Sequence, residues 1–234
     1  MLKAYHKSQA GFSLAELMVG AVVGLLVLSG VIAMYSTTIG ASTDNLLVAR
    51  LNQELRATLG VMMSDIRRSG YYAGVPGIDD MTNNPFQQGV NDLTVDDVGA
   101  VADACITFAY DRDRNKAVGD GTGGTTMEQY GFRLTNNAVQ LRTGGNAFSC
   151  TVGTWLNVTS GVTEVTQLVF TVAETCLNVI TEAAGCPCTT DDPCQHIREV
   201  GISITGRLAS DDQVQQTITE SVRVRNDKFV AAAP

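Results

Sequence analysis

The stretch GFSLAELMVG, residues 11–20, places a single acidic residue, Glu16, at the start of a long apolar run. From Leu17 to Thr43 no residue carries a charge. The segment Leu17–Tyr35 alone would form a helix of roughly 28 Å, close to the thickness of a bilayer core. A carboxylate buried beside such a segment costs on the order of 2–3 kcal/mol unless it finds a partner. The position of Glu16 therefore needs an explanation.

The residues before this stretch, MLKAYHKSQA at positions 1–10, are basic because of Lys3 and Lys7. The apolar run is too long for an ordinary secretory signal, and the segment SGVIAMYS within it offers only a poor cleavage site. A plain transmembrane anchor fits the length, and the two lysines would hold its N-terminus in the cytoplasm. Neither interpretation accounts for Glu16.

The basic leader, the sequence GFSLAE at residues 11–16 and the apolar run together resemble the signal segment of type IV prepilins and pseudopilins. The resemblance implies that a prepilin peptidase cleaves the bond between Gly11 and Phe12. Phe12 would then become the new terminus and would be N-methylated.

Cleavage at this bond would create a cationic amine on Phe12, four residues before Glu16. An amine and a carboxylate in an apolar environment are tolerable as a pair, because removing one partner costs roughly 3–5 kcal/mol. The resemblance therefore implies that Glu16 pairs with the Phe12 amine of its own chain or of a neighbouring subunit. This pair would set the axial register during filament assembly.

Beyond Asp44 the apolar residues recur at steps of three and four: Val48, Leu51, Leu55, Leu59, Met62 and Ile66. This spacing predicts an amphipathic helix that lies along a globular head. Gly70, which follows two arginines, is predicted to cap its C-terminus. The sequence RLNQELRATLGVMM and the stretch DIRRSGYYAG at residues 65–74 resemble the PilW group of minor pilins.

The remainder of the chain has the pattern of antiparallel strands. Residues 75–100 are rich in loop-forming residues, and a strand is expected at CITFAYD. Two hairpins and one further strand are expected, at residues 130–142, 198–226 and 165–172. A long helix followed by antiparallel strands predicts an α+β fold. In the first hairpin, Thr135, Asn136 and Asn137 are expected to form the connection.

The resemblance implies a pilin-like version of this fold. The hydrophobic half of the N-terminal helix would be transmembrane or form the filament core, and its second half would pack against an antiparallel β-sheet head with disulfide-stapled loops. The corresponding divisions are a leader at residues 1–11, a hydrophobic helix at 12–43, an amphipathic helix at 44–70 and a head at 71–234.

Six cysteines, an even number in a chain with an export signal, indicate disulfides in an oxidising compartment. Cys105 and Cys150 flank the first hairpin and could staple it. The other four lie in one loop: Cys176, Cys186, Cys188 and Cys194. Six cysteines allow fifteen pairings, and the sequence does not choose among them. Zinc is disfavoured because the spacing lacks paired C-x-x-C units.

One loop has the beginning of a calcium-binding pattern. In DRDRNKAVGDGT, residues 111–122, Asp111, Asp113 and Asn115 stand where an EF-hand loop places its first ligands. Lys116 and Thr122 replace the glycine and glutamate of that pattern, so a solvated turn is the competing interpretation. Calcium is the one cofactor that the sequence suggests.

The composition disfavours two classes of function. With 16 basic and 24 acidic residues the chain carries a net charge of −8, which argues against a nucleic-acid-binding surface. The sequence contains no G-x-S-x-G and no H-E-x-x-H motif. His196, the one histidine beyond the leader, is expected on the surface. We therefore expect a non-enzymatic protein.

The resemblance implies a structural minor pilin of the PilW kind, acting in initiation of a type IV pilus or in its tip complex and supporting twitching motility or adhesion. Its partners would be prepilin peptidase, other major and minor pilins, and the inner-membrane assembly platform. It would span the inner membrane once, with its head in the periplasm, before it enters a surface pilus. The alternatives are a type II secretion pseudopilin and a tip adhesin or DNA-binding pilin.

Overall fold

The computed structural model describes residues 11–74, 82–145, 147–188 and 192–231. The expected leader residues 1–10, including Lys3 and Lys7, lie outside the described residues. The chain forms two compact units, Met1–Leu47 and Val48–Pro234. Helix α1, Leu14–Ile66, begins in the first unit and ends in the second.

In the first unit, the side chains of residues 11–46 are all exposed. Five hydroxyl groups within this apolar stretch donate to backbone carbonyls one turn earlier in the helix. Ser29 Oγ donates to the Leu26 carbonyl at 2.8 Å, and Thr38 Oγ1 donates to the Met34 carbonyl at 2.8 Å. Such bonds satisfy hydroxyls without any partner outside the helix. The surface that this segment presents is therefore apolar along most of its length.

In the second unit, α1 buries the predicted apolar stripe. Its buried residues are Leu51, Leu55, Thr58, Leu59, Met62 and Ile66. The prediction was wrong for Val48, which is 37% exposed at the boundary of the unit. The helix ends at Ile66, so Gly70 lies beyond it in a turn rather than directly at the cap. The Gly70 backbone has a φ of 72° and its N–H donates to the Ala109 carbonyl at 2.8 Å.

The strands form two antiparallel sheets, whereas the sequence predicted one. The first is a five-stranded meander of consecutive neighbours: β1 Thr94–Val98, β2 Val101–Ala109, β3 Gln129–Thr135, β4 Ala138–Gly144 and β5 Thr154–Asn157. The second contains β6 Thr163–Asn178, β7 Cys194–Leu208, β8 Asp211–Arg223 and β9 Lys228–Val230. In this sheet β6 and β8 flank β7, and β9 pairs with the start of β7.

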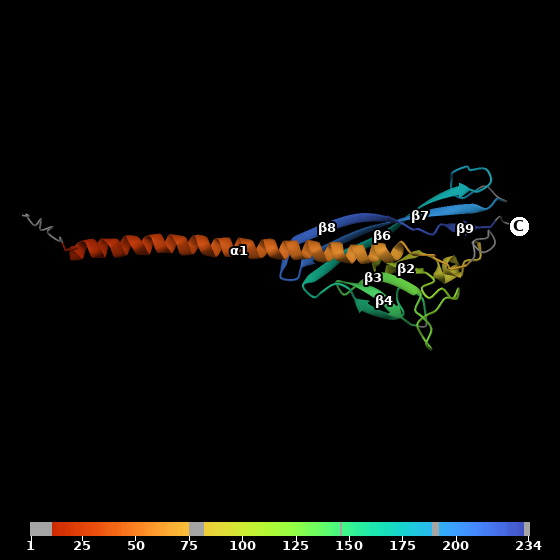
Figure 1. Ribbon diagram of the computed structural model, residues 1–234, viewed down its shortest axis with the longest axis horizontal. Coiled ribbons are helices and arrows are strands. Elements are labelled where there is room, and N and C mark those ends of the chain that lie inside the picture. The colour runs from red at the N-terminus through yellow and green to blue at the C-terminus, as the bar shows by residue number, and fades with distance from the viewer. Residues whose placement is uncertain (1–10, 75–81, 146, 189–191, 232–234) are drawn as a thin grey trace, which may run out of the picture. The chain divides into compact units, whose positions relative to one another are not determined.

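The two sheets and the C-terminal part of α1 share one core. Figure 1 shows strands of both sheets alongside this part of the helix. Phe108 of β2 and Phe132 of β3 are fully buried with their ring centroids 6.3 Å apart, and Phe170 of β6 is buried as well. Burial of such side chains contributes about 1.5–3 kcal/mol each. These buried aromatic side chains therefore contribute to the stability of the head.

The hairpins and strands expected from sequence are confirmed, with longer strands than predicted. Asn136 and Asn137, with φ angles of 52° and 58°, connect β3 to β4. Positive φ at both central residues is the geometry of a two-residue hairpin turn, and asparagine tolerates it well. Thr135, expected in the turn, belongs to β3. Residues 94–98, expected to be loop, form the edge strand β1, which two adjacent aspartates made difficult to recognise.

Candidate functional site

The N-terminus of α1 is closed by Ser13 and Glu16. The Ser13 N–H donates to Glu16 Oε2 at 3.0 Å, and the Ala15 N–H donates to Ser13 Oγ at 3.3 Å. This reciprocal arrangement is a variant of the capping box in which Ser13 Oγ accepts from the second helical residue instead of the third, and it satisfies two backbone donors at the helix start. The S-x-x-E spacing at residues 13–16 is the sequence signal of this motif and could have predicted it.

The expected cleavage site lies just before this cap and is open. Phe12 is 88% exposed, and a β-carbon at Gly11 would meet no heavy atom within 4 Å. Only one oxygen of Glu16 is used by the capping box. The carboxylate can therefore accept a further hydrogen bond without losing its role at the helix start.

Among the described residues of the first unit, none covers the apolar segment that follows. Figure 1 draws it as the part of α1 that begins in red near the N-terminus. Within the part of the chain that the structure describes, α1 is the one helix long and apolar enough to cross a membrane. A β-carbon at Gly20 or Gly24 would also meet nothing within 4 Å. Small residues four apart allow another helix to approach closely in lipid.

In the second unit, Glu54 holds α1 to the loop between β5 and β6. Its Oε1 accepts from the Ser160 N–H, and its Oε2 accepts from Ser160 Oγ at 2.9 Å and from Thr163 Oγ1 at 2.7 Å. Hydrogen bonds to a charged group are worth about 1.5–3 kcal/mol each. No local sequence pattern pointed to Glu54, because its partners lie more than a hundred residues further along the chain.

All six cysteines form disulfides, which pair Cys105 with Cys150, Cys176 with Cys186, and Cys188 with Cys194. The first bond joins β2 to the segment after β4, so it closes across the first hairpin. The other two lie within and beside the loop between β6 and β7. The structure thus selects one of the fifteen possible pairings.

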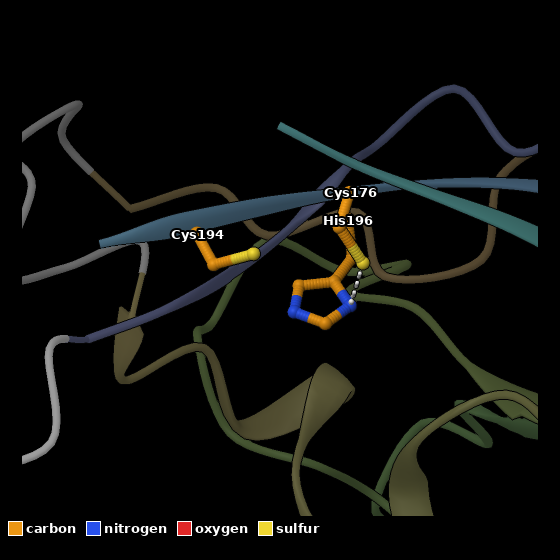
Figure 2. Close-up of side chains that lie close together, drawn as sticks. All are labelled: Cys176, Cys194 and His196. Atoms are coloured by element: carbon orange, nitrogen blue, oxygen red, sulfur yellow. Dashed lines mark hydrogen bonds between the residues drawn. The ribbon is translucent and has the colours of Figure 1, made fainter. Parts of the chain in front are cut away.

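Cys176, Cys194 and His196 lie close together, as Figure 2 shows. The Cys176 sulfur is 3.5 Å from His196 Nδ1, and the same nitrogen is 2.9 Å from Glu174 Oε1. Both sulfurs belong to disulfides, so neither is a thiolate available to zinc. His196 was expected on the surface. Its side chain is instead partly buried, with 19% of it exposed.

The acidic loop between β2 and β3 brings together two of the three predicted calcium ligands and one that was missed. Carboxylate oxygens of Asp111, Asp113 and Glu128 all lie within 4.8 Å of one another. Asn115 instead bonds to Asp113, from its Nδ2 to Oδ2 at 3.0 Å. Glu128 stands immediately before β3, too far along the chain for the EF-hand spacing to identify it.

Glu128 is fully buried, and backbone donors surround it. Its Oε1 accepts from the Arg112 N–H at 2.7 Å and the Asp113 N–H at 3.2 Å, and its Oε2 accepts from the Gly119 N–H at 3.0 Å. Burial raises the pKa of this carboxyl, while these backbone hydrogen bonds oppose the shift and the Asp113 charge adds to it. The loop is thus wrapped around a carboxylate that belongs to the next strand.

Comparisons with known families agree with the expected class. The family model described as prepilin peptidase-dependent protein B matches residues 44–224, and that of the prokaryotic N-terminal methylation motif matches residues 6–32. No curated protein and no solved structure matches the chain. The N-terminal apolar helix fits a membrane-anchored pilin, and both matches are to pilin-like, structural classes. The chain belongs to the prepilin peptidase-dependent protein B family and carries the N-terminal methylation motif of type IV pilin-like proteins.

Proposed function

We propose that this protein is a structural minor pilin of a type IV pilus, of the PilW kind, that acts in assembly initiation or in the tip complex. The observation that carries the proposal is the exposed apolar segment of α1 with one carboxylate, Glu16, at its start. A surface of this kind is stable in a membrane or against other apolar helices, not in water. The membrane would surround this segment before assembly, and the helices of identical or related subunits would surround it in the filament.

Assembly would begin with cleavage between Gly11 and Phe12 by prepilin peptidase. The new ammonium group on Phe12 would pair with Glu16 of a neighbouring subunit or of the same chain. Glu16 Oε2 accepts from the Ser13 N–H, which leaves Oε1 for the ammonium group. In an apolar core the unpaired ion costs several kcal/mol, so a subunit one register out of place would be rejected.

The head would stay outside the helical core and contact other major and minor pilins. Before assembly the protein would sit in the inner membrane with its head in the periplasm, where the three disulfides are stable. The same location gives access to the assembly platform and, in the finished filament, to the cell surface. Twitching motility and adhesion would be the cellular readouts, and no enzymatic activity is expected.

The test separates the charge of Glu16 from its role in the capping box. Glutamine at the third helical position can replace glutamate in a capping box, so Glu16→Gln keeps the cap and removes the charge. Ser13→Ala, the matched control, weakens the cap and keeps the charge. We expect Glu16→Gln to be cleaved normally but to be depleted from sheared filaments at least about tenfold, the equivalent of 1.4 kcal/mol. Normal incorporation of Glu16→Gln, or an equal defect in Ser13→Ala, would contradict the pairing mechanism.

A second candidate is a pseudopilin of a type II secretion system, favoured by the same N-terminal motif, which serves both systems. Deletion of the gene distinguishes them. Loss of surface pili and of twitching with normal enzyme secretion supports the minor pilin. Loss of secreted enzymes with normal pili supports the pseudopilin.

A further inference from the structure

The acidic loop, residues 111–128, gathers three carboxylates that no ion pair neutralises within the described residues. Asp111, Asp113 and Glu128 each direct one oxygen to within 4.8 Å of the other two. Asp111 is 1% exposed and Glu128 is fully buried, so water screens their charges poorly. Like charges held this close repel one another unless a proton or a cation is shared among them.

The two oxygens of Asp111 provide a second, independent observation that points to a bound cation. Its Oδ2 accepts from the Ala73 N–H at 3.0 Å, whereas its Oδ1 is buried and has no hydrogen-bond partner in the described structure. An unsatisfied buried polar atom costs about 1–3 kcal/mol, and more when it is charged. A structural loop has no reason to retain this cost, but a metal ligand needs a free oxygen lone pair.

The remaining contacts hold the carboxylates in place without using all of their oxygen lone pairs. Glu128 accepts two backbone N–H groups on Oε1 and one on Oε2, so a lone pair remains on Oε2. Asp113 Oδ1 accepts from the Asn115 N–H at 3.0 Å, which fixes its direction. Arg114 and Lys116, with φ angles of 62° and 68°, turn the backbone sharply between these contacts. The loop is therefore preorganised around the three oxygens.

Positive groups near the cluster do not take the place of an ion. A neighbouring pocket of about 540 Å³ is lined by Asp111 and by four arginines, Arg68, Arg112, Arg114 and Arg225. None of these arginines forms an ion pair with the three carboxylates within the described residues. If Glu128 served only to hold the loop through hydrogen bonds, its backbone contacts would be explained. The unpartnered oxygen of Asp111 and the closeness of the Asp113 carboxylate would not be.

We propose that Asp111, Asp113 and Glu128 bind one Ca²⁺ ion. An all-oxygen set of hard, charged ligands suits Ca²⁺ or Mg²⁺ and not zinc. Ca²⁺ takes oxygens at about 2.3–2.6 Å in flexible geometry, so its ligands can stand up to about 5 Å apart. Mg²⁺ demands a near-ideal octahedron at about 2.0–2.1 Å and gives up its water reluctantly, so a set of protein carboxylates alone suits it less well than Ca²⁺. Asn115, expected as a ligand from the sequence, instead donates hydrogen bonds to the Asp113 carboxylate.

The experiment measures Ca²⁺ binding by the full chain in detergent micelles after removal of metals with a chelator. Calorimetric titration and thermal unfolding are followed with CaCl₂ up to about 5 mM, above the weakest affinities of extracellular calcium modules. Asp113→Asn removes one ligand charge from an exposed side chain and keeps the acceptor for the Asn115 N–H. Asp212→Asn, an exposed aspartate of β8, is the control for the same change in net charge.

We expect one ion per chain, a higher unfolding temperature in Ca²⁺, at least about tenfold weaker binding by Asp113→Asn, and unchanged binding by Asp212→Asn. Absence of binding and of a thermal shift in the wild-type chain overturns the proposal. So does wild-type binding by Asp113→Asn, or equally tight binding of MgCl₂. These readouts do not involve filament assembly, so the result is independent of the proposed pilus function.

Discussion

Gly206 of β7 lies so close to Leu55 of α1 that a β-carbon at residue 206 would stand 2.8 Å from Leu55 Cδ2. The Leu55 side chain is fully buried, and the backbone carbonyl of Glu164 lies 3.5 Å from the same position. The missing side chain of the glycine thus makes the space in which the helix packs on the second sheet. This contact joins the amphipathic stripe of the sequence to a strand about 150 residues later.

Gly206→Ala is therefore expected to destabilise the head by about 1–3 kcal/mol, the usual cost of overpacking a well-filled core. Chemical denaturation of the full chain in detergent measures the change. Gly60→Ala is the matched control, because residue 60 is exposed on α1 and a β-carbon there meets nothing within 4 Å. Its helix propensity predicts a gain of up to about 1 kcal/mol. Equal effects of the two substitutions would contradict the packing described for Gly206.

Glu54→Ala should cost about 1.5–3 kcal/mol, since it removes a charged acceptor from the Ser160 and Thr163 donors at once. Arg56→Ala, at an exposed position two residues further along α1, provides the control and should change the stability by less than about 0.5 kcal/mol. The same denaturation experiment reads both. A Glu54→Ala variant as stable as the wild type would show that these hydrogen bonds do not hold the helix to the head.

The contribution of each disulfide to the free energy of unfolding should depend on the length of the loop that it closes. Replacing Cys105 and Cys150 by serine opens a loop with a sequence separation of 45, and chain entropy predicts a loss of roughly 4 kcal/mol. The pair Cys188 and Cys194, with a separation of 6, should contribute roughly 2 kcal/mol. Unfolding of the two double variants under oxidising conditions tests the order. The reverse order would mean that native-state strain or residual structure outweighs loop entropy.

Gly11→Ala should leave the leader attached without harming the fold. A β-carbon at residue 11 meets no heavy atom of the described residues within 4 Å, so we expect any defect to arise in recognition by the peptidase. Mass spectrometry of the membrane fraction should find an N-terminus at Met1 or Leu2 instead of Phe12. Ser13→Ala, which lies on the other side of the bond, should still be cleaved. Cleavage of the Gly11→Ala variant would contradict the assignment of the cleavage site to the bond after Gly11.

Several features follow from residues that lie next to one another in the chain. The apolar run, the position of Glu16 and the basic leader predicted the pilin-like class, and the N-terminal methylation motif matches residues 6–32. The stripe from Leu51 to Ile66 predicted a buried helix face because helical period is a local property. The turn at Asn136 and Asn137 predicted its hairpin for the same reason.

Only the tertiary structure decided the rest. Division of the strands into two sheets and the approach of Glu128 to Asp111 both depend on strand registers that bring distant residues together. Those registers result from the joint packing of many side chains, and no short window of sequence contains that information. Periodicity in the sequence predicts which residues are buried. Which residues they contact depends on how all the side chains of the core pack together.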